Sequence, residues 1–303
     1  MAGLTPNIGA SVRQRLLNRA RARGIDYSLL LLRFLNERVL YRLSRSPHRD
    51  SFVLKGAMTF DLWVDAGHRP TRDIDLLGFG QNAPDAIAAM FREILATEVE
   101  PDGLEFDLES VQAERIAEAD RYPGVRVSAD AWLTSARLRL HIDVGFGDVV
   151  TPEPSIASLP TLLGFPAPEV RVYPPETVVA EKFEAMVDLG IANTRMKDFY
   201  DIWLLADTIA FARPGLASAI RATFLRRGTP LPTGEPPLAL TQEFTANPEK
   251  AQQWQAFLSR TGLDAAPTLG AVVEALQRFL LPVLRDDSAE GQHWDPESWT
   301  WRV

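Results

Sequence analysis

Apolar residues recur along this chain with two periods, one of three to four residues and one of two. The longer period is typical of amphipathic helices, and the shorter one of strands with one buried face. In the N-terminal half, helices are predicted at 12–23, 27–43, 57–64 and 85–97. Strands are predicted at 52–54, 73–76, 104–108, 109–116, 125–133 and 137–144. The last strand has a polar face, because Arg139, His141 and Asp143 alternate with apolar residues.

The second half of the chain is predicted to be mainly helical. Proline and glycine are frequent between 151 and 175, which indicates a linker between domains. Helices are predicted after it at 176–189, 196–211, 215–226, 248–260 and 268–284. The tail around Trp294, Trp299 and Trp301 lacks periodicity, so we expect it either to pack as an extended arm or to be mobile. The expected division is a helical lead-in of 1–50, a sheet domain of 51–160 and a helical domain of 161–303.

Composition narrows the class of protein. An apolar content of 46% in 303 residues is enough for real cores. The chain has no cysteine, which excludes disulfides, thiolate metal sites and cysteine catalysis. Its longest apolar run, 29–32, is too short to span a bilayer, and no apolar leader follows Met1. We therefore expect a cytoplasmic protein without a membrane segment.

The charge of the chain is unevenly distributed. A net charge of −8 argues against bulk, non-specific coating of nucleic acid. Basic residues nevertheless crowd the first predicted helix, which carries Arg13, Arg15, Arg19, Arg21 and Arg23. These arginines form either a solvated helix face or a contact surface for RNA phosphates, and the sequence favours neither.

Two aspartates flank one apolar residue in Asp73-Ile74-Asp75. On a strand they share a face, where unpaired carboxylates repel each other. A hard divalent cation between them would remove this repulsion. Asp143, on the polar face of a later strand, would complete an oxygen cage for one or two Mg²⁺ ions that also bind substrate phosphates. The alternative is that all three are solvent-facing strand acids.

Residues near these acids are candidates for phosphate binding. Gly56 follows a strand and begins a predicted helix, whose N-terminus offers free backbone N–H groups to a phosphate. Lys55 adds a charge there, although tight packing alone also explains many glycines. Further donors precede the acid pair, namely Arg69, Thr71 and Arg72.

Two candidates lie in the helical half. Lys182 falls within the apolar stripe of its helix, so it must either extend its ammonium to water or meet an anion, such as a nucleotide. Asp198 begins a helix at the edge of an apolar stripe, and Asp201 shares its face. A partly desolvated carboxylate is a general-base candidate, although the helix dipole by itself also favours an acid there.

The combination resembles the AbiEii/AbiGii-type toxin nucleotidyltransferases, a branch of the DNA polymerase β-like superfamily found in bacterial toxin–antitoxin and phage-defence systems. The resemblance rests on Leu54-Lys-Gly-Ala, Arg69-Pro-Thr-Arg-Asp-Ile-Asp75, Asp143, Ala180-Glu-Lys182-Phe-Glu-Ala and Arg195-Met-Lys-Asp198-Phe-Tyr-Asp201. It covers 52–205, and the order and spacing of its motifs carry it. It implies an α+β fold with a nucleotidyltransferase-type mixed sheet, flanking helices and a mainly helical C-terminal domain.

The resemblance also implies roles for single residues. Asp73 and Asp75 would bind metal, Lys182 would contact the nucleotide, and Asp198 would be essential. One departure is that Ala57 and Met58 follow Gly56, where the family commonly has Gly-Gly-Thr or Gly-Ser. A hydroxyl donor to the triphosphate is thus missing, and either Thr71 or backbone N–H groups would replace it.

The implied activity is Mg²⁺-dependent transfer of a nucleoside monophosphate from an NTP to an acceptor hydroxyl. A tRNA 3′ end is the acceptor that the resemblance favours, and a protein or small molecule is the alternative within the same class. A cognate antitoxin would accompany a toxin, without necessarily binding it. The competing hypothesis is a catalytically silent relative that binds only a nucleotide or a protein partner.

Overall fold

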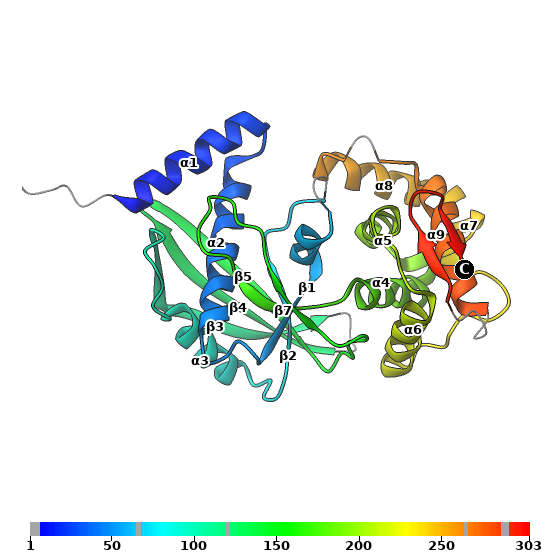
Figure 1. Cartoon of the computed structure of the whole chain (residues 1–303), viewed down its shortest axis with the longest axis horizontal. Helices are drawn as coiled ribbons and strands as arrows, with labels where there is room; N and C mark the ends of the chain where they lie inside the picture. The colour runs from blue at the N-terminus through cyan, green and yellow to red at the C-terminus, as the bar shows by residue number, and fades with distance from the viewer. Residues whose placement is uncertain (1–6, 65–67, 119–121, 264–265, 286–290) are drawn as a thin grey trace, which may run out of the picture. The chain divides into compact units, whose positions relative to one another are not determined.

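The computed structural model describes all residues except 1–6, 65–67, 119–121, 264–265 and 286–290. The chain divides into two units, coloured along the sequence in Figure 1. The first unit comprises 1–62, 70–147 and 155–172, and the second comprises 63–69, 148–154 and 173–303. In the described part of the chain, no helix combines the length and the apolar character needed to cross a membrane.

The first unit is built on a mixed sheet in the order β3-β4-β5-β2-β1-β7-β6. Its strands are β1 (Phe52–Lys55), β2 (Ile74–Gly78), β3 (Leu104–Glu118), β4 (Tyr122–Leu133), β5 (Ala136–Phe146), β6 (Ser155–Ser158) and β7 (Glu169–Val172). β2 pairs antiparallel with β1 and parallel with β5, and β1 is parallel to β7. The expected α+β class with a mixed sheet is confirmed.

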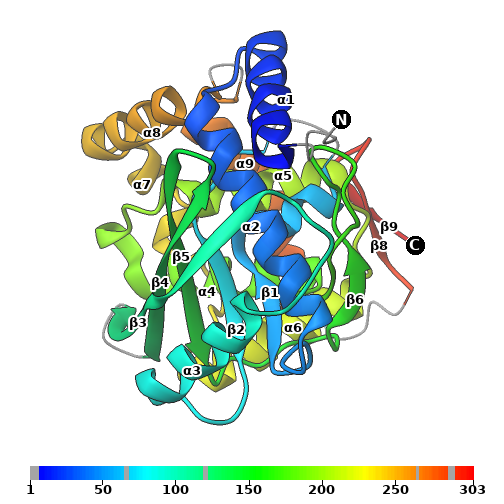
Figure 2. The same cartoon turned by 90° about the vertical axis from the view of Figure 1, so that its left-hand side faces the viewer.

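Helices pack on one face of this sheet. They are α1 (Ile8–Arg23), α2 (Tyr27–Arg45) and α3 (Pro84–Leu95). Figure 2 shows α2 lying across the strands, and α1 and α3 both contact α2. The apolar positions of β5 that alternate with its polar residues, such as Leu140 and Ile142, are fully buried in this core. The opposite side of the strand therefore presents the polar residues.

Local capping explains where the first two helices begin and end. The side chain of Asn7 accepts a hydrogen bond from Ala10 N at 2.9 Å, and that of Asp26 accepts one from Leu29 N at 3.1 Å. Such N-caps satisfy backbone donors that have no partner within the helix. Gly24 ends α1 in the left-handed region, with φ of 64°, which favours glycine.

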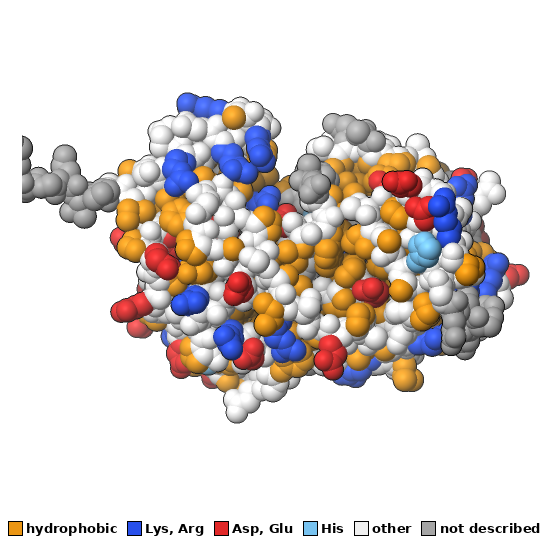
Figure 3. All heavy atoms as spheres, viewed as in Figure 1, with side chains coloured by type: hydrophobic (Ala, Val, Ile, Leu, Met, Phe, Trp, Pro, Cys, Tyr) orange, Lys and Arg blue, Asp and Glu red, His pale blue; other side chains and the backbone are white. Residues whose placement is uncertain are grey.

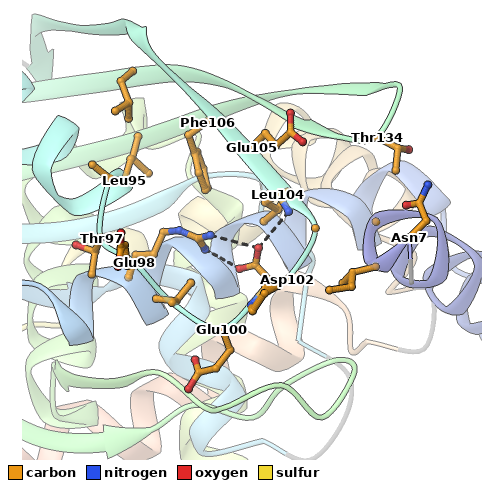
Figure 4. A pocket seen from close by; sticks show the side chains of 18 residues that line it. Asn7, Leu95, Thr97, Glu98, Glu100, Asp102, Leu104, Glu105, Phe106 and Thr134 are labelled. Atoms are coloured by element: carbon orange, nitrogen blue, oxygen red, sulfur yellow. Dashed lines mark hydrogen bonds and ion pairs between the residues drawn. The ribbon is translucent and has the colours of Figure 1, made fainter. Parts of the chain in front are cut away.

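A buried ion cluster connects α2 to the segment before β3. Arg42 donates to both oxygens of Asp102, at 2.6 and 3.2 Å, and Arg38 Nε donates to Asp102 Oδ2 at 3.3 Å. Arg38 and Asp102 are at most 2% exposed, so both charges have lost their water. Asp102 borders a pocket of about 630 Å³, where it also accepts a hydrogen bond from Leu104 N (Figure 4). The cluster thus links α2 to the segment before β3 through buried charges that stabilise one another.

The second unit is mainly helical, as predicted. Its helices are α4 (Pro175–Leu189), α5 (Met196–Thr208), α6 (Arg213–Arg227), α7 (Gln242–Ala246), α8 (Pro248–Thr261) and α9 (Leu269–Arg285). The tail packs as a hairpin of β8 (His293–Asp295) and β9 (Thr300–Arg302). Trp294 is buried and donates from its indole to Ala206 O at 2.7 Å, so the tail is part of this unit.

Three local expectations were wrong. The expected linker at 151–175 contains β6 and β7, which have four residues each and are too short for a periodic pattern to stand out among the prolines and glycines. The helix expected at 57–64 is a 3₁₀ helix, η1 (Gly56–Leu62). The strands expected at 104–108 and 109–116 form one strand, β3, whose pairing with β4 is irregular between Asp107 and Gln112.

The ion cluster predicts a large effect of Asp102→Ala. The substitution leaves Arg38 and Arg42 buried without their carboxylate, so we expect a loss of about 3–5 kcal/mol in the free energy of unfolding. Asp50→Ala is the matched control, because the Arg49–Asp50 ion pair is largely exposed and such pairs contribute about 0–1 kcal/mol. Urea unfolding followed by circular dichroism measures both. Equal losses in the two variants would contradict the structural role of Asp102.

Candidate functional site

A row of charged residues crosses four neighbouring strands of the first unit. In the sheet register Asp75 lies beside Lys55 of β1 on one side and beside Asp143 of β5 on the other. Asp143 in turn pairs with Arg126 of β4. Asp73 comes just before β2, two residues from Asp75, and its charge acts on Arg126 of the same row. The fold therefore brings the predicted acids of two distant sequence segments together.

Arg126 is a member of this row that the sequence did not indicate. Its Nε and Nη2 atoms donate to the two oxygens of Asp143 at 2.8 and 2.7 Å. Hydrogen bonding and charge from Asp143 raise the pKa of Arg126, and Asp73 adds to this effect. No group of three metal-type side chains converges among the described residues. The assignment of Asp143 as a metal ligand therefore stays a prediction, and its carboxylate is bound to Arg126 here.

Two glycines leave space for the charged groups of the row. Gly56 has φ of 71°, and a Cβ atom there would lie 2.1 Å from Asp75 Oδ2. On β5, a Cβ atom at Gly145 would lie 3.2 Å from Lys55 Nζ. Any larger residue at Gly56 would displace the Asp75 carboxylate. Gly56 thus leaves room for the Asp75 carboxylate, and the phosphate binding expected of it from the sequence stays a prediction.

His141 is another polar residue on this side of β5. It lies two residues before Asp143 and pairs with Ser128 of β4 in the register. Its Nδ1 atom is buried and has no hydrogen-bond partner in the described structure. A buried imidazole nitrogen without a partner is uncommon, because burial of an unsatisfied polar atom costs free energy.

The predicted phosphate donors before β2 lie in different units. In the first unit, the Thr71 hydroxyl donates to Asp73 O at 3.3 Å, and the Arg72 side chain is exposed. Arg69 belongs to the second unit, where its Nε and Nη2 atoms donate to Asp201 at 3.1 and 3.0 Å. Arg69 is thus held by a buried carboxylate of α5.

Lys182 and Asp198 meet in a buried ion network of the second unit. Lys182 Nζ on α4 lies 2.7 Å from Asp198 Oδ1 and 2.8 Å from Asp201 Oδ2, and both aspartates are fully buried. Arg195 Nε donates to Asp198 Oδ2 at 2.7 Å. Lys182 therefore meets anions of its own chain, which was one of the two outcomes expected for a lysine in an apolar stripe.

Asp201 is the centre of this network and was not among the predicted site residues. It accepts from Arg69, from Lys182 and from His68 Nε2, the last at 3.2 Å. Its spacing of three residues from Asp198 was the one signal in the sequence, because it places both carboxylates on one helix face. The partners from 68–69 are remote in sequence and could not be read from it.

The network shifts the pKa values of its two aspartates and its lysine. Burial alone would raise the pKa of Asp201, but Lys182, Arg69 and His68 hold it well below its usual value. The pKa of Asp198 is lowered because Lys182 and Arg195 outweigh burial. Burial acts to lower the pKa of Lys182, and the two aspartates raise it above its usual value. Lys182, Asp198 and Asp201 are therefore charged at neutral pH, whereas burial lowers the pKa of His68.

The sequence matches the family described as "Nucleotidyl transferase AbiEii toxin, Type IV TA system" over residues 38–280, more than half of the chain. The chain therefore belongs to the AbiEii family of nucleotidyltransferase toxins, which act in type IV toxin–antitoxin systems. No curated protein is significantly similar to it in sequence.

Two solved structures from Helicobacter pylori are similar to this chain. One is JHP933, with 15% identity and a TM-score of 0.45 over 82% of this chain and 94% of that one. The other, described as a candidate nucleotidyltransferase, has 15% identity and a TM-score of 0.44 over 84% of this chain and 99% of that one.

The ion network predicts how Asp201→Asn responds to pH. At pH 7 the variant lacks the charge that Lys182 and Arg69 need, so we expect a loss of about 3–5 kcal/mol in unfolding free energy. The folded-state pKa of Asp201 lies below its unfolded value of about 3.9. Its stabilisation is therefore present above pH 4 and is lost as pH falls through the folded-state pKa.

The difference in stability between wild type and Asp201→Asn should accordingly be full at pH 7 and should shrink below about pH 4. Chemical unfolding at several pH values measures it. Glu274→Gln, at an exposed carboxylate of α9, is the control and should change stability by less than about 0.5 kcal/mol. A difference that does not change with pH would show that the charge of Asp201 is not what stabilises the protein.

Proposed function

We propose that this chain transfers a nucleoside monophosphate from an NTP to the 3′ end of a tRNA. The observation that supports the proposal is the row in the first unit, where Asp75 of β2 lies between Lys55 of β1 and Asp143 of β5, and Asp73 comes just before β2. Family membership supports nucleotidyl transfer as the reaction class, and the choice of tRNA as the acceptor is our proposal.

The donor set fits a magnesium site. Asp73, Asp75 and Asp143 offer only carboxylate oxygens, the ligands that Mg²⁺ prefers. The space that Gly56 leaves for the Asp75 carboxylate is part of this fit. We propose Asp73 and Asp75 as ligands, joined by Asp143 when its carboxylate is released from Arg126. One or two bound ions would lower the pKa of the attacking hydroxyl and neutralise the leaving pyrophosphate.

The other residues have proposed roles of their own. Lys55 places a cation beside Asp75 for the triphosphate, and Thr71 and Arg72 lie one and two residues before Asp73 as further donors. For Lys182 and Asp198 the support is the family resemblance. Asp198 and Asp201 orient the ammonium of Lys182 with two of its three protons, so one proton is left for a nucleotide.

The biological setting follows from the family. A toxin of a type IV system has a cognate antitoxin, which in our proposal counteracts the enzyme without necessarily binding it. NTPs and tRNA are both found in the cytoplasm, so we propose that compartment as the place of action. A protein or small-molecule acceptor is the second candidate. The replacement of the usual hydroxyl residue by Ala57 and Met58 favours a third, a silent nucleotide-binding relative.

A transfer assay tests the reaction. We expect the protein, incubated with Mg²⁺, total tRNA and each labelled NTP in turn, to place the label on RNA. Digestion of the labelled tRNA from its 3′ end locates the added nucleotide. Label on protein or on a small molecule would identify the second candidate, and no transfer with any of the four NTPs would favour the silent relative.

The metal ligands are tested by Asp73→Asn. We expect transfer to fall by more than about 100-fold, beyond the 10- to 100-fold typical of residues that only support a ligand. Stability without metal should be unchanged or higher, because the substitution removes one of several neighbouring like charges. Thermal unfolding provides this check, and Asp85→Asn, on the first turn of α3, is the control. A variant that unfolds would show that Asp73 is structural.

A further inference from the structure

Helix α1 carries a concentrated positive charge in an acidic protein. Its sixteen residues contain five arginines and no acid, whereas the whole chain has 32 basic and 40 acidic residues. Figure 3 shows Lys and Arg side chains gathered over this helix. The remaining question is whether neighbouring carboxylates neutralise them.

The contacts of these arginines are with uncharged acceptors. Arg13 donates to the hydroxyls of Thr134 and Ser135 at 3.0 and 2.9 Å. Arg15 donates to Leu163 O, and Arg19 donates to Leu162 O at 2.7 Å. Bonds of this kind fix a guanidinium in place without an ion pair, and only Arg19 has part of its charge offset by a carboxylate, that of Glu37. Within the described ranges, no arginine of α1 forms an ion pair with a carboxylate.

The charges are close enough to repel one another. The pKa of Arg19 is lowered by burial and then by the nearby charges of Arg23 and Arg33, which together outweigh a smaller opposing effect of Glu37. Arg33 is paired with Asp61 at 3.0 Å, but Arg23 is exposed at the end of α1. Arg15, Arg19 and Arg23 follow one another at intervals of four residues, or about 6 Å along the helix. A row of this kind matches a ligand with regularly repeated negative charges.

We propose that the exposed face of α1 binds the phosphate backbone of the acceptor RNA. Three arginines held by uncharged acceptors provide fixed positions, and Arg21 and Arg23 add mobile charge. Such contacts position a nucleic acid without reading its sequence. This inference rests on the proposed function, because it supplies the docking surface for the polynucleotide acceptor.

The structure favours a nucleic acid over an anionic membrane. A helix that lies on a membrane inserts its apolar face into the lipid. The apolar face of α1, formed by Val12, Leu16 and Ala20, is at most 4% exposed and packs in the core of the first unit. Among the described residues, no large apolar side chain of α1 is exposed. What α1 offers to a partner is therefore charge alone.

The test removes positive charge from α1 at positions where the side chains make no packing contacts that the fold needs. Arg21 and Arg23 are exposed and make no hydrogen bond or ion pair in the described structure, so Arg21→Gln/Arg23→Gln should fold normally. The control is Arg278→Gln/Arg285→Gln, which removes two exposed charges from α9 of the second unit. Binding of fluorescent tRNA is measured by anisotropy without NTP, at several salt concentrations.

We expect the α1 variant to bind tRNA roughly tenfold more weakly at 0.1 M salt. The slope of log K against log salt concentration should become shallower by about one for each arginine removed, with no change in the control. Arg21→Glu/Arg23→Glu should weaken binding further. Three results would each overturn the proposal. The salt slope could be the same in all proteins, or the wild type could fail to bind tRNA. The third is arginine-dependent binding to phosphatidylserine vesicles in place of tRNA.

The transfer assay separates this inference from the proposed function. If tRNA binding depends on α1 but no nucleoside monophosphate is transferred, the docking surface stands and the proposed reaction fails. If nucleotide is transferred to tRNA while both variants bind and react like the wild type, the reaction stands and α1 is not its docking surface.

Discussion

The parallel pairing of β2 with β5 is the constraint on which the candidate site depends. Its register sets Asp75 beside Asp143 and aligns Ile74 with Ile142 in the core. A slip by one residue would turn every side chain of β2 to the other face, placing acids in the core and apolar residues among the acids. Burial of Ile74 and Leu76 therefore stabilises the same register that assembles the charged row. The cost of gathering like charges is offset by packing on the other side of the strand and by the neighbouring cations, Lys55 and Arg126.

Each unit also contains buried carboxylates that are held by more than one cation. Asp102 is bound by Arg38 and Arg42 in the first unit, and Asp201 by Lys182 and Arg69 in the second. Charges that have lost water are stable only while their partners remain, so neither network tolerates loss of a single member. In the second unit this network holds two of the predicted site residues, Lys182 and Asp198. Lys182 and Asp198 therefore stabilise the fold in addition to any role at a nucleotide.

Charge distribution has a separate consequence for function. The net charge of the protein is negative, yet α1 presents arginines whose partners are hydroxyl and carbonyl groups. Because salt screens exposed charges beyond about 10 Å, a local surface of one sign can bind a polyanion in spite of the overall charge. Composition alone argued against bulk binding of nucleic acid, and it could not exclude a localised surface.

Much of the fold could be predicted from the sequence, because helices and half-buried strands leave a periodic pattern of apolar residues. The period predicted α1, α2, α4 and β5, and the spacing of Asp73 and Asp75 placed two carboxylates on one side of a strand. Elements of four residues such as β6 and β7 are too short for such a pattern to stand out and were missed. Tertiary structure alone decided which charges meet. Arg126 reaches Asp143 through the register of the β4–β5 pairing, and Arg69 reaches Asp201 although 132 positions separate them in sequence. Side-chain periodicity reports the environment of a residue, whereas partner identity depends on strand order and helix packing, which are set only when the whole chain folds.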